Sequence, residues 1–439
     1  MTPSQQTPNQ LGLVEAAEAI RSGSLRPSEL VDACLRRIAE REPIVGAWSY
    51  LDPDAARAAA VERDREAPRG ALHGIPLGVK DIIDTVDMPT ELGTPIYRGR
   101  RTQWDASSVA LARRAGAIIL GKTVTTAFAY FAPGKTTHPL NAAHTPGGSS
   151  SGSAAAVADC MVPAAFATQT AASIIRPASF CGVVGYKPSF GTFSPAGVRL
   201  CAESLDTLGT ITRNVADARY LRCALLGEAF DRVGAAGRSR AGDHAGLRVG
   251  LCRTPWWSEA EADSRAAVDR AAQRLAERGA TVAEAVLPAG FAALADDQRL
   301  ITAFEGARSY AYEYDAHRNE LDPLFLELIG QGLAIDRVRY ATARARTARA
   351  VGEFGNWIDR WDLLLTPAAT GEAPKGLAST GDPVFGRLWT LLGVPSIALP
   401  GFTGANGLPV GVQLVAGPGD DARLLDWAQW IERVIASDG

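Results

Sequence analysis

The stretch from Pro146 to Ser173 constrains the fold and chemistry of this chain more than any other. It runs PGGSSSGSAAAVADCMVPAAFATQTAAS, so glycine, serine and alanine dominate it. Glycine tolerates backbone dihedrals that other residues avoid, and small side chains let the main chain approach a ligand closely. The composition therefore predicts a site built from hydroxyl groups and backbone amides.

Local signals inside this stretch predict a helix followed by a strand. Residues 152–159 are alanine-rich and favour a helix, and Pro163 ends it. Residues 164–168 can then run extended toward the following small-residue segment. A helix out and a strand back would return Ser173 to the neighbourhood of Ser149.

The rest of the chain alternates amphipathic helical segments with short apolar segments. Helical spacing of apolar residues predicts helices within 11–40 (with a break at 23–27), 55–65, 107–117, 215–226, 259–278, 299–353 and 421–436. Apolar runs predict strands or strand and turn segments at 75–80, 117–122, 180–185, 209–213, 247–252, 280–287, 363–366 and 408–415. This alternation indicates a layered α/β fold.

Composition excludes several classes of partner. With 439 residues, 46% of them hydrophobic and 21% charged, the chain can bury a sizeable core. Its net charge of −3 gives no basic field for a polyanion, so we expect no nucleic-acid partner. No run approaches the roughly 18 apolar residues of a membrane span, and the polar start MTPSQQTPNQ has no signal-peptide pattern. We therefore expect a cytoplasmic protein without a membrane anchor.

Cysteine usage argues against a metal site. The six cysteines form no CxxC pair, and no histidine stands at metal-ligand spacing from them. Buried free thiols in a reducing compartment are the simpler interpretation. We expect neither a metal nor an organic cofactor.

Several motifs together resemble the amidase signature family of serine hydrolases. The run GGSSSGS from Gly147 carries Ser149, and Ser173 follows it by 24 residues (173 − 149). The segments LHGIPLGVKDIIDT (72–85), AGAIILGKTVTTAFA (115–129), WTLLGVPSIALPGF and GLPVGVQLVAGPGDDARLL are similar to the family as well. The resemblance implies an α/β fold in which a mixed β-sheet core is sandwiched by α-helices.

Motifs separated by some 300 residues must meet if this resemblance holds, which favours one large domain over 1–439. We expect four parts within it. They are N-terminal helices (1–70), a catalytic core (71–213), a helical and variable part (214–360), and C-terminal core strands with a closing helix (361–439).

Carried over residue by residue, the resemblance assigns three catalytic roles. Ser173 is the nucleophile, Lys80 is the general base, and Ser149 bridges them after a cis Gly148–Ser149 peptide bond. Lysine is a base near neutral pH only if burial lowers its pKa from about 10.4. The end of the apolar run IPLGVK is a suitable place for such burial.

The resemblance also implies an oxyanion hole made by backbone N–H groups of Thr170, Ala171, Ala172 and Ser173. This chain has QTAAS where DTGGS is the commonest family sequence. Ala172 adds a methyl beside the nucleophile and cannot adopt dihedrals reserved for glycine. Gln169 removes a carboxylate that could have organised the loop.

Candidate substrate contacts are less constrained. Arg176, three residues after the nucleophile, either binds a substrate carboxylate or carbonyl oxygen, or forms a structural ion pair with Asp81 or Asp84. The aromatic residues of a loop-like segment, Phe128, Tyr130 and Phe131, are either a pocket wall or ordinary packing.

These features predict an enzyme that cleaves the C–N bond of carboxamides through an acyl-Ser173 intermediate. The same machinery could serve a carbamate (urethane), aryl-amide or ester hydrolase. A further alternative is the amidase subunit of a tRNA-dependent amidotransferase, which would depend on partner subunits and prefer glutamine. The last alternative is a non-catalytic binding protein. The expected partner is a small-molecule amide, ester or carbamate, and the expected state is a monomer or homodimer.

Overall fold

The computed structural model describes residues 6–230 and 246–436, so residues 1–5 of the polar start lie outside the described chain. The described strands form one 11-stranded sheet in the order β1-β3-β2-β4-β6-β5-β10-β11-β9-β7-β8. The strands are β1 (Trp48–Leu51), β2 (Pro76–Lys80), β3 (Ile118–Thr123), β4 (Ala164–Gln169), β5 (Val184–Lys187), β6 (Thr207–Thr212), β7 (Arg248–Leu251), β8 (Thr281–Glu284), β9 (Leu363–Pro367), β10 (Ser396–Thr403) and β11 (Pro409–Val415).

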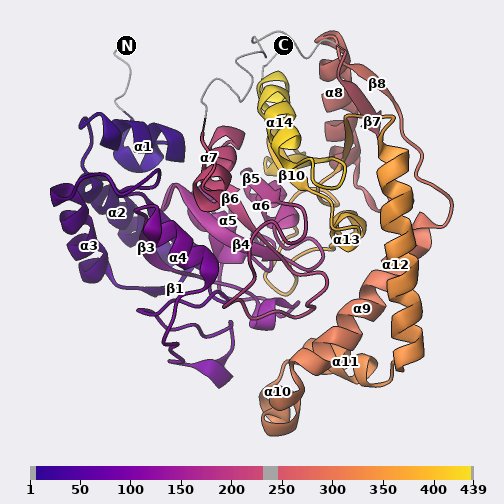
Figure 1. Ribbon diagram of the computed structural model, residues 1–439, viewed down its shortest axis with the longest axis horizontal. Coiled ribbons are helices and arrows are strands. Elements are labelled where there is room, and N and C mark those ends of the chain that lie inside the picture. The colour runs from indigo at the N-terminus through magenta and orange to yellow at the C-terminus, as the bar shows by residue number, and fades with distance from the viewer. Residues whose placement is uncertain (1–5, 231–245, 437–439) are drawn as a thin grey trace.

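Helices flank this sheet, and α9 to α12 form an arm along one side of the molecule (Figure 1). The helices are α1 (Leu13–Arg21), α2 (Pro27–Val45), α3 (Pro53–Arg65), α4 (Ser107–Arg114), α5 (Ser151–Ala158), α6 (Ile175–Cys181), α7 (Val215–Leu226), α8 (Ala262–Glu277), α9 (Leu294–Ser309), α10 (Ala311–Ala316), α11 (Pro323–Leu333), α12 (Arg337–Ile358), α13 (Val384–Leu391) and α14 (Asp421–Ala436). Among the described residues, no helix is both long and apolar enough to cross a membrane.

The sheet is mixed. β2 pairs in parallel with β3 and β4, and β7 pairs in parallel with β8 and β9, whereas the central strands pair antiparallel. β5 lies beside β10, so the C-terminal strands continue the same sheet as the strands from the first half of the chain. The predicted α/β fold with a mixed sheet between helices is therefore confirmed.

Local signals account for most element boundaries. α7 begins after Asn214, whose side chain accepts a hydrogen bond from the N–H of Asp217, and ends at Gly227 with φ 70°. The predicted strand and turn over 180–185 is wrong in its first half. Phe180 belongs to α6, Gly182 ends that helix with φ 70°, and β5 begins only at Val184. A short apolar run crossing a helix end does not reveal the boundary by periodicity.

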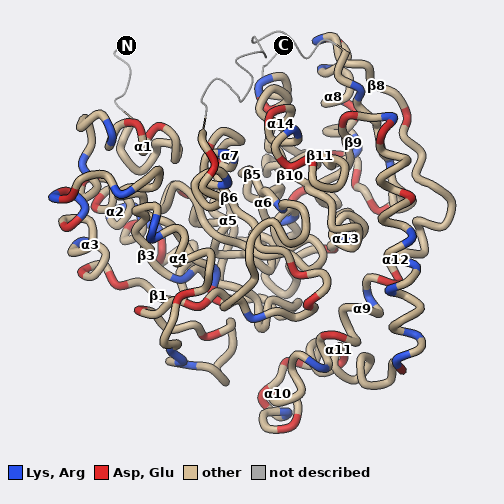
Figure 2. Tube along the Cα trace, viewed as in Figure 1, with Lys and Arg blue, Asp and Glu red and all other residues tan. Residues whose placement is uncertain are grey.

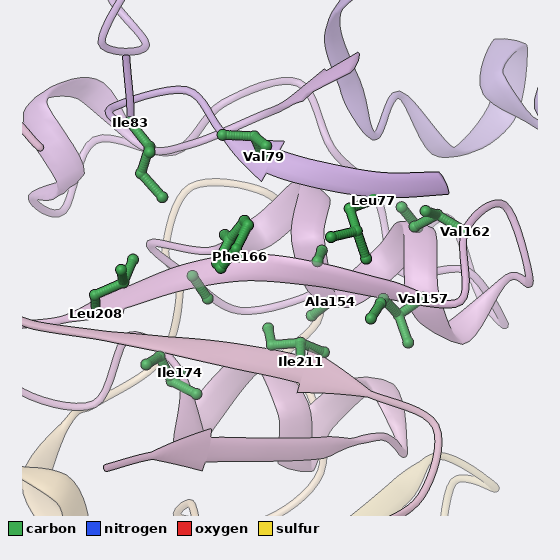
Figure 3. Close-up of a cluster of buried hydrophobic side chains, with 14 of the residues drawn as sticks. Leu77, Val79, Ile83, Ala154, Val157, Val162, Phe166, Ile174, Leu208 and Ile211 are labelled. Carbon is green, nitrogen blue, oxygen red and sulfur yellow. The ribbon is translucent and has the colours of Figure 1, made fainter. Parts of the chain in front are cut away.

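Helix α5, which lies within the small-residue stretch, is buried against the sheet. Figure 3 shows its Ala154 and Val157 beside Leu77, Phe166 and Ile211, which come from β2, β4 and β6. All five side chains are fully buried. The stretch therefore contains a core helix, which anchors the loop that precedes it.

Close packing explains why this helix needs small residues. A Cβ atom on Gly152 would lie 2.2 Å from the carbonyl oxygen of Ala47 and 2.4 Å from the amide nitrogen of Val124. Real Cβ atoms do not approach backbone atoms so closely, so a side chain here would push α5 away from the sheet.

Charged residues of both signs are interspersed along the helices (Figure 2), and no large region of one sign stands out in that view. All six cysteines are free, and all but Cys160 are buried. No group of three or more His, Cys, Asp or Glu side chains within the described chain is placed to hold a metal ion.

Candidate active site

Lys80 lies at the carboxyl end of β2, beside the carboxyl end of β4, because the two strands are parallel neighbours. Its side chain is fully buried. Its Nζ donates to Ser149 Oγ at 2.7 Å and to Thr168 Oγ1 at 2.8 Å. Burial lowers the pKa of Lys80 to about 7, against a smaller opposing effect of the Asp206 carboxylate. Lys80 is thus a candidate base at neutral pH.

Ser149 follows a cis Gly148–Ser149 peptide bond, as the resemblance implies. Its carbonyl accepts from the N–H of Thr126 at 3.3 Å, and α5 begins two residues later. Gly147, with φ 82°, adopts a left-handed conformation that glycine tolerates. The Gly-rich loop therefore directs the Ser149 hydroxyl toward the buried lysine.

Ser173 lies between β4 and α6, and its side chain is 8% exposed. The N–H of Ser150 donates to the carbonyl of Ser173 at 3.3 Å, so the loops that carry the two serines adjoin. No hydrogen bond joins Ser149 Oγ to Ser173 Oγ among those of the described residues. The structure thus brings the lysine and the bridging serine into direct contact and sets the predicted nucleophile beside them.

The predicted oxyanion loop has backbone N–H groups that are available to bind a ligand. The N–H groups of Ala171, Ala172 and Ser173 have no acceptor among the described residues. The hydroxyl of Thr170 donates to the Asp206 carboxylate, which also accepts from the N–H of Cys201 at 2.6 Å. Free amides on an anchored loop are what a developing oxyanion requires.

Gln169 organises the nucleophile loop without a carboxylate. Its Oε1 accepts from the N–H groups of Ile174 and Ile175 at 2.9 and 3.1 Å. Its Nε2 donates to Thr390 Oγ1 at 3.0 Å, and that hydroxyl donates to the carbonyl of Ala171 at 2.8 Å. A neutral amide both accepts and donates, so it secures both sides of the loop.

Ala172 fits because a glycine faces it. Ala172 is not among the residues with positive φ, so the loop demands no conformation reserved for glycine. A Cβ atom on Gly386 of α13 would lie 2.6 Å from Ala172 Cβ and 2.5 Å from the carbonyl oxygen of Ala171. The methyl group that distinguishes QTAAS is therefore accommodated by the missing side chain of Gly386.

Arg176 forms neither of the ion pairs expected from the sequence. Asp81 lies 3.4 Å from Lys122, and Asp84 lies 2.9 Å from Arg100. Nη2 of the buried Arg176 donates to the carbonyl of Gly148 at 2.8 Å and to Thr380 Oγ1 at 3.0 Å. The ion-pair prediction is wrong because the guanidinium instead holds the loop that precedes Ser149.

A cavity of about 700 Å³, including its open mouth, leads to Ser173. Tyr130 and Phe131 line it, but Phe128 does not. Phe128 is 2% exposed and stacks on Phe325 with ring centroids 4.7 Å apart, so it belongs to the aromatic core.

The far wall of the cavity comes from elements without a recognised motif. It includes Gln298 and Thr302 of α9, Leu328 of α11 and Arg387 of α13. Sequence reasoning missed these residues because they reach the site only through the way in which α9, α11 and α13 pack in space. Asp206, which directly precedes β6, was missed as well.

A buried lysine hydrogen-bonded to a serine, beside a second serine on a loop of free amides, defines the class of site expected of an amide hydrolase. The amidase family model matches residues 29–425. The chain belongs to the amidase (amidase signature) family.

Similar proteins support this membership. The chain is 33% identical to a glutamyl-tRNA(Gln) amidotransferase subunit from Chloroflexus aggregans, over 95% of each chain. It is also 33% identical to the corresponding protein of an Anaeromyxobacter species, over 97% of this chain and 96% of that one. A solved amidase shares 30% identity, with a TM-score of 0.86 and coverage of 96% and 99%. The peptide amidase from Stenotrophomonas maltophilia shares 29% identity, with a TM-score of 0.82 and 98% of each chain covered.

Proposed function

We propose that this chain hydrolyses the C–N bond of carboxamides through an acyl-Ser173 intermediate. The observation that carries the proposal is the fully buried Lys80, 2.7 Å from Ser149 Oγ, with a pKa lowered to about 7. A lysine that is neutral at physiological pH and bonded to a serine hydroxyl is suited to accept a proton rather than to bind an anion.

In the proposed reaction, neutral Lys80 accepts the proton of Ser149 as Ser149 accepts that of Ser173. Ser173 Oγ then bonds to the amide carbon, and the negative carbonyl oxygen receives hydrogen bonds from the loop amides. The proton returns through Ser149 to the leaving nitrogen, the C–N bond breaks, and an amine departs. Water, deprotonated by the same relay, attacks the ester, which releases the acid and restores Ser173.

This machinery also suits anilides, carbamates and esters, because each presents an acyl carbon to Ser173 and a leaving group to the returning proton. We place amides first because a relay that protonates the leaving atom matters most when that atom is a poorly departing nitrogen.

A second candidate is the amidase subunit of a tRNA-dependent amidotransferase. The curated relatives favour it, since they are named as amidotransferase subunits and align over nearly their whole length. Such a subunit would release ammonia from glutamine and depend on partner subunits. The cavity favours the stand-alone hydrolase, because no Asp or Glu is among its described lining residues to receive the α-ammonium group of glutamine.

A hydrolysis screen of the purified chain separates the two candidates. Aliphatic amides, anilides, esters, carbamates and glutamine are compared, each with Ser173→Ala as the matched blank. Turnover of simple amides or anilides by the chain alone supports the stand-alone hydrolase. Turnover of glutamine alone, or activity that appears only with partner subunits, supports the amidotransferase. An absence of any Ser173-dependent turnover and of Ser173 acylation contradicts both.

A further inference from the structure

The cavity at Ser173 contains buried positive charge that no protein carboxylate neutralises. Arg176 and Arg387 line it, and neither forms an ion pair with a described residue. Asp382 acts on both at longer range, but it is exposed, and its carboxylate accepts from the N–H of Val384 at the start of α13. The third lining arginine, Arg299, is already paired with Asp296 at 2.7 Å.

Of these two arginines, Arg176 is buried and Arg387 is partly exposed, and Arg387 makes fewer hydrogen bonds. Arg176 is committed to the carbonyl groups of Gly148 and Gly381 and to Thr380. The only hydrogen bond of Arg387 within the described chain runs from Nη1 to Gln298 Oε1 at 2.8 Å. Its Nε is buried without a partner. A guanidinium with a single neutral acceptor does not recover from the protein the interactions with water that it has lost.

The orientation of Arg387 is fixed by the oxyanion loop. Gln298 is fully buried, and its Nε2 donates to the carbonyl of Thr170 at 3.0 Å and to Thr302 Oγ1 at 3.1 Å. Because its amide nitrogen is engaged there, its oxygen must face Arg387. The guanidinium is therefore held in place before a ligand arrives, which reduces the entropy lost on binding.

The remaining wall suits a hydrocarbon segment. Tyr130, Phe131 and Leu328 line the same cavity as Ser173 and Arg387. A ligand that reaches both Ser173 and Arg387 in this cavity therefore has aromatic and aliphatic surface available to it as well.

We propose that the cavity selects amides that carry a carboxylate, and that Arg387 is the residue that determines this specificity. The inference rests on the proposed function and names its substrate class, such as monoamides of dicarboxylic acids. An arginine fork binds a carboxylate through two parallel N–H···O hydrogen bonds. Glutamine is a poorer ligand than glutaric acid monoamide, because its ammonium group meets arginines and no carboxylate.

The test compares glutaric acid mono-4-nitroanilide with its methyl ester, two substrates that differ by one charge. We expect kcat/KM of the wild type to favour the acid by about 10- to 100-fold, the range of a charged hydrogen bond in a buried site. Arg387→Gln should bring the ratio of kcat/KM for the acid to that for the ester close to 1. Arg387→Lys should keep part of the preference. Arg344→Gln is the control. It removes a surface arginine of α12 that pairs with Glu305 of α9, and it should keep the whole preference for the acid.

A second pair of substrates places the charge on the other side of the scissile bond. N-butyryl-4-aminobenzoate and its methyl ester carry the carboxylate or its neutral form on the leaving group. A preference in either pair that depends on Arg387 supports the proposal and shows which side of the substrate faces α13. Equal use of acid and ester in both pairs, or a preference unchanged in Arg387→Gln, overturns it.

A binding measurement separates this inference from the proposed function. Glutarate should raise the melting temperature of Ser173→Ala and should not raise that of Ser173→Ala/Arg387→Gln. Stabilisation that depends on Arg387 supports the carboxylate site even if no amide is turned over. Stabilisation that is equal in both proteins, or absent from both, contradicts it even if Ser173 is catalytic.

Discussion

Lys80 Nζ and Ser149 Oγ lie 2.7 Å apart, and both side chains are at most 1% exposed. In water the lysine amine has a pKa of about 10.4, so at neutral pH it is already protonated and cannot accept a proton. Burial disfavours the charged amine, so it brings the pKa of Lys80 to about 7. The protein thus turns an ordinary cation into a group that can exchange a proton with its serine neighbour.

The pH dependence of turnover follows from this shift. Only the neutral amine accepts a proton, so kcat/KM for a neutral anilide should rise about tenfold per pH unit below pH 7 and reach a plateau above it. In Lys80→Ala this acidic limb should disappear and activity should fall by about 10²- to 10⁴-fold. An acidic limb that persists unchanged in the variant would show that another group is the base.

The pH dependence of stability has a definite sign as well. The pKa of Lys80 is lower in the folded than in the unfolded chain, so between pH 7 and about 10.4 the unfolded chain binds more protons. Lys80 therefore makes the free energy of unfolding rise with pH across that window. Lys80→Met should flatten this rise in urea titrations at several pH values, and an unchanged slope would mean that Lys80 stays charged when folded.

Lys80 and Ser149 should behave as one unit in catalysis. Ser149→Ala should lose less activity than Lys80→Ala, because a water molecule can partly replace the bridging hydroxyl. The double variant should then cost little beyond Lys80→Ala, since members of a relay are not additive. Single-turnover rates of the four proteins measure this coupling, and losses that multiply as independent effects would refute the relay.

Arg176→Ala should reduce stability and kcat together. Truncation leaves the carbonyl of Gly148 and the hydroxyl of Thr380 without their donor. The free energy of unfolding should therefore fall by about 2 to 4 kcal/mol. The loss also frees the Ser149 loop, so kcat should fall while KM for a neutral amide changes little. Arg248→Ala, which breaks an exposed ion pair with Asp362, is the matched control and should cost less than about 1 kcal/mol. A change confined to KM would assign Arg176 to substrate binding instead.

Gly386→Ala tests the packing beneath the oxyanion loop. The added methyl would clash with the carbonyl of Ala171 and the Cβ of Ala172. We therefore expect the free energy of unfolding to fall by about 1 to 3 kcal/mol and kcat to fall as well. Gly355→Ala on α12 is the control, because a Cβ there meets nothing within 4 Å and alanine favours a helix. Adding Ala172→Gly should rescue Gly386→Ala only in part, since the clash with the Ala171 carbonyl remains. Equal behaviour of the two glycine variants would contradict this packing account.

The sequence allows much of the scaffold to be predicted because its signals are local. The bounds of α7 agree with the predicted range 215–226, because Asn214 caps its start and Gly227 ends it. Helix α14 begins at Asp421, as predicted. Lys80 is predictable as a buried side chain because it ends an apolar run. These features depend on neighbours in sequence.

The walls of the site depend instead on neighbours in space. Nothing near Gln298 or Arg387 in the sequence indicates that α9 and α13 converge on Thr170. Phe128 and Tyr130 are two residues apart in one aromatic loop, yet one packs in the core and the other lines the cavity. Both rings contact Phe325 of α11, so their surroundings depend on a helix that is distant in the sequence.

The most direct test of the account is the site of covalent modification. A fluorophosphonate probe reacts with a serine only when a base activates it and amides stabilise the oxyanion. After reaction at pH 8, peptide mapping by mass spectrometry should find the adduct on Ser173 alone. Ser173→Ala should take up no probe, and Lys80→Ala should react far more slowly. An adduct on Ser149 or on any other residue, or amide hydrolysis that survives in Ser173→Ala, would contradict the central claim.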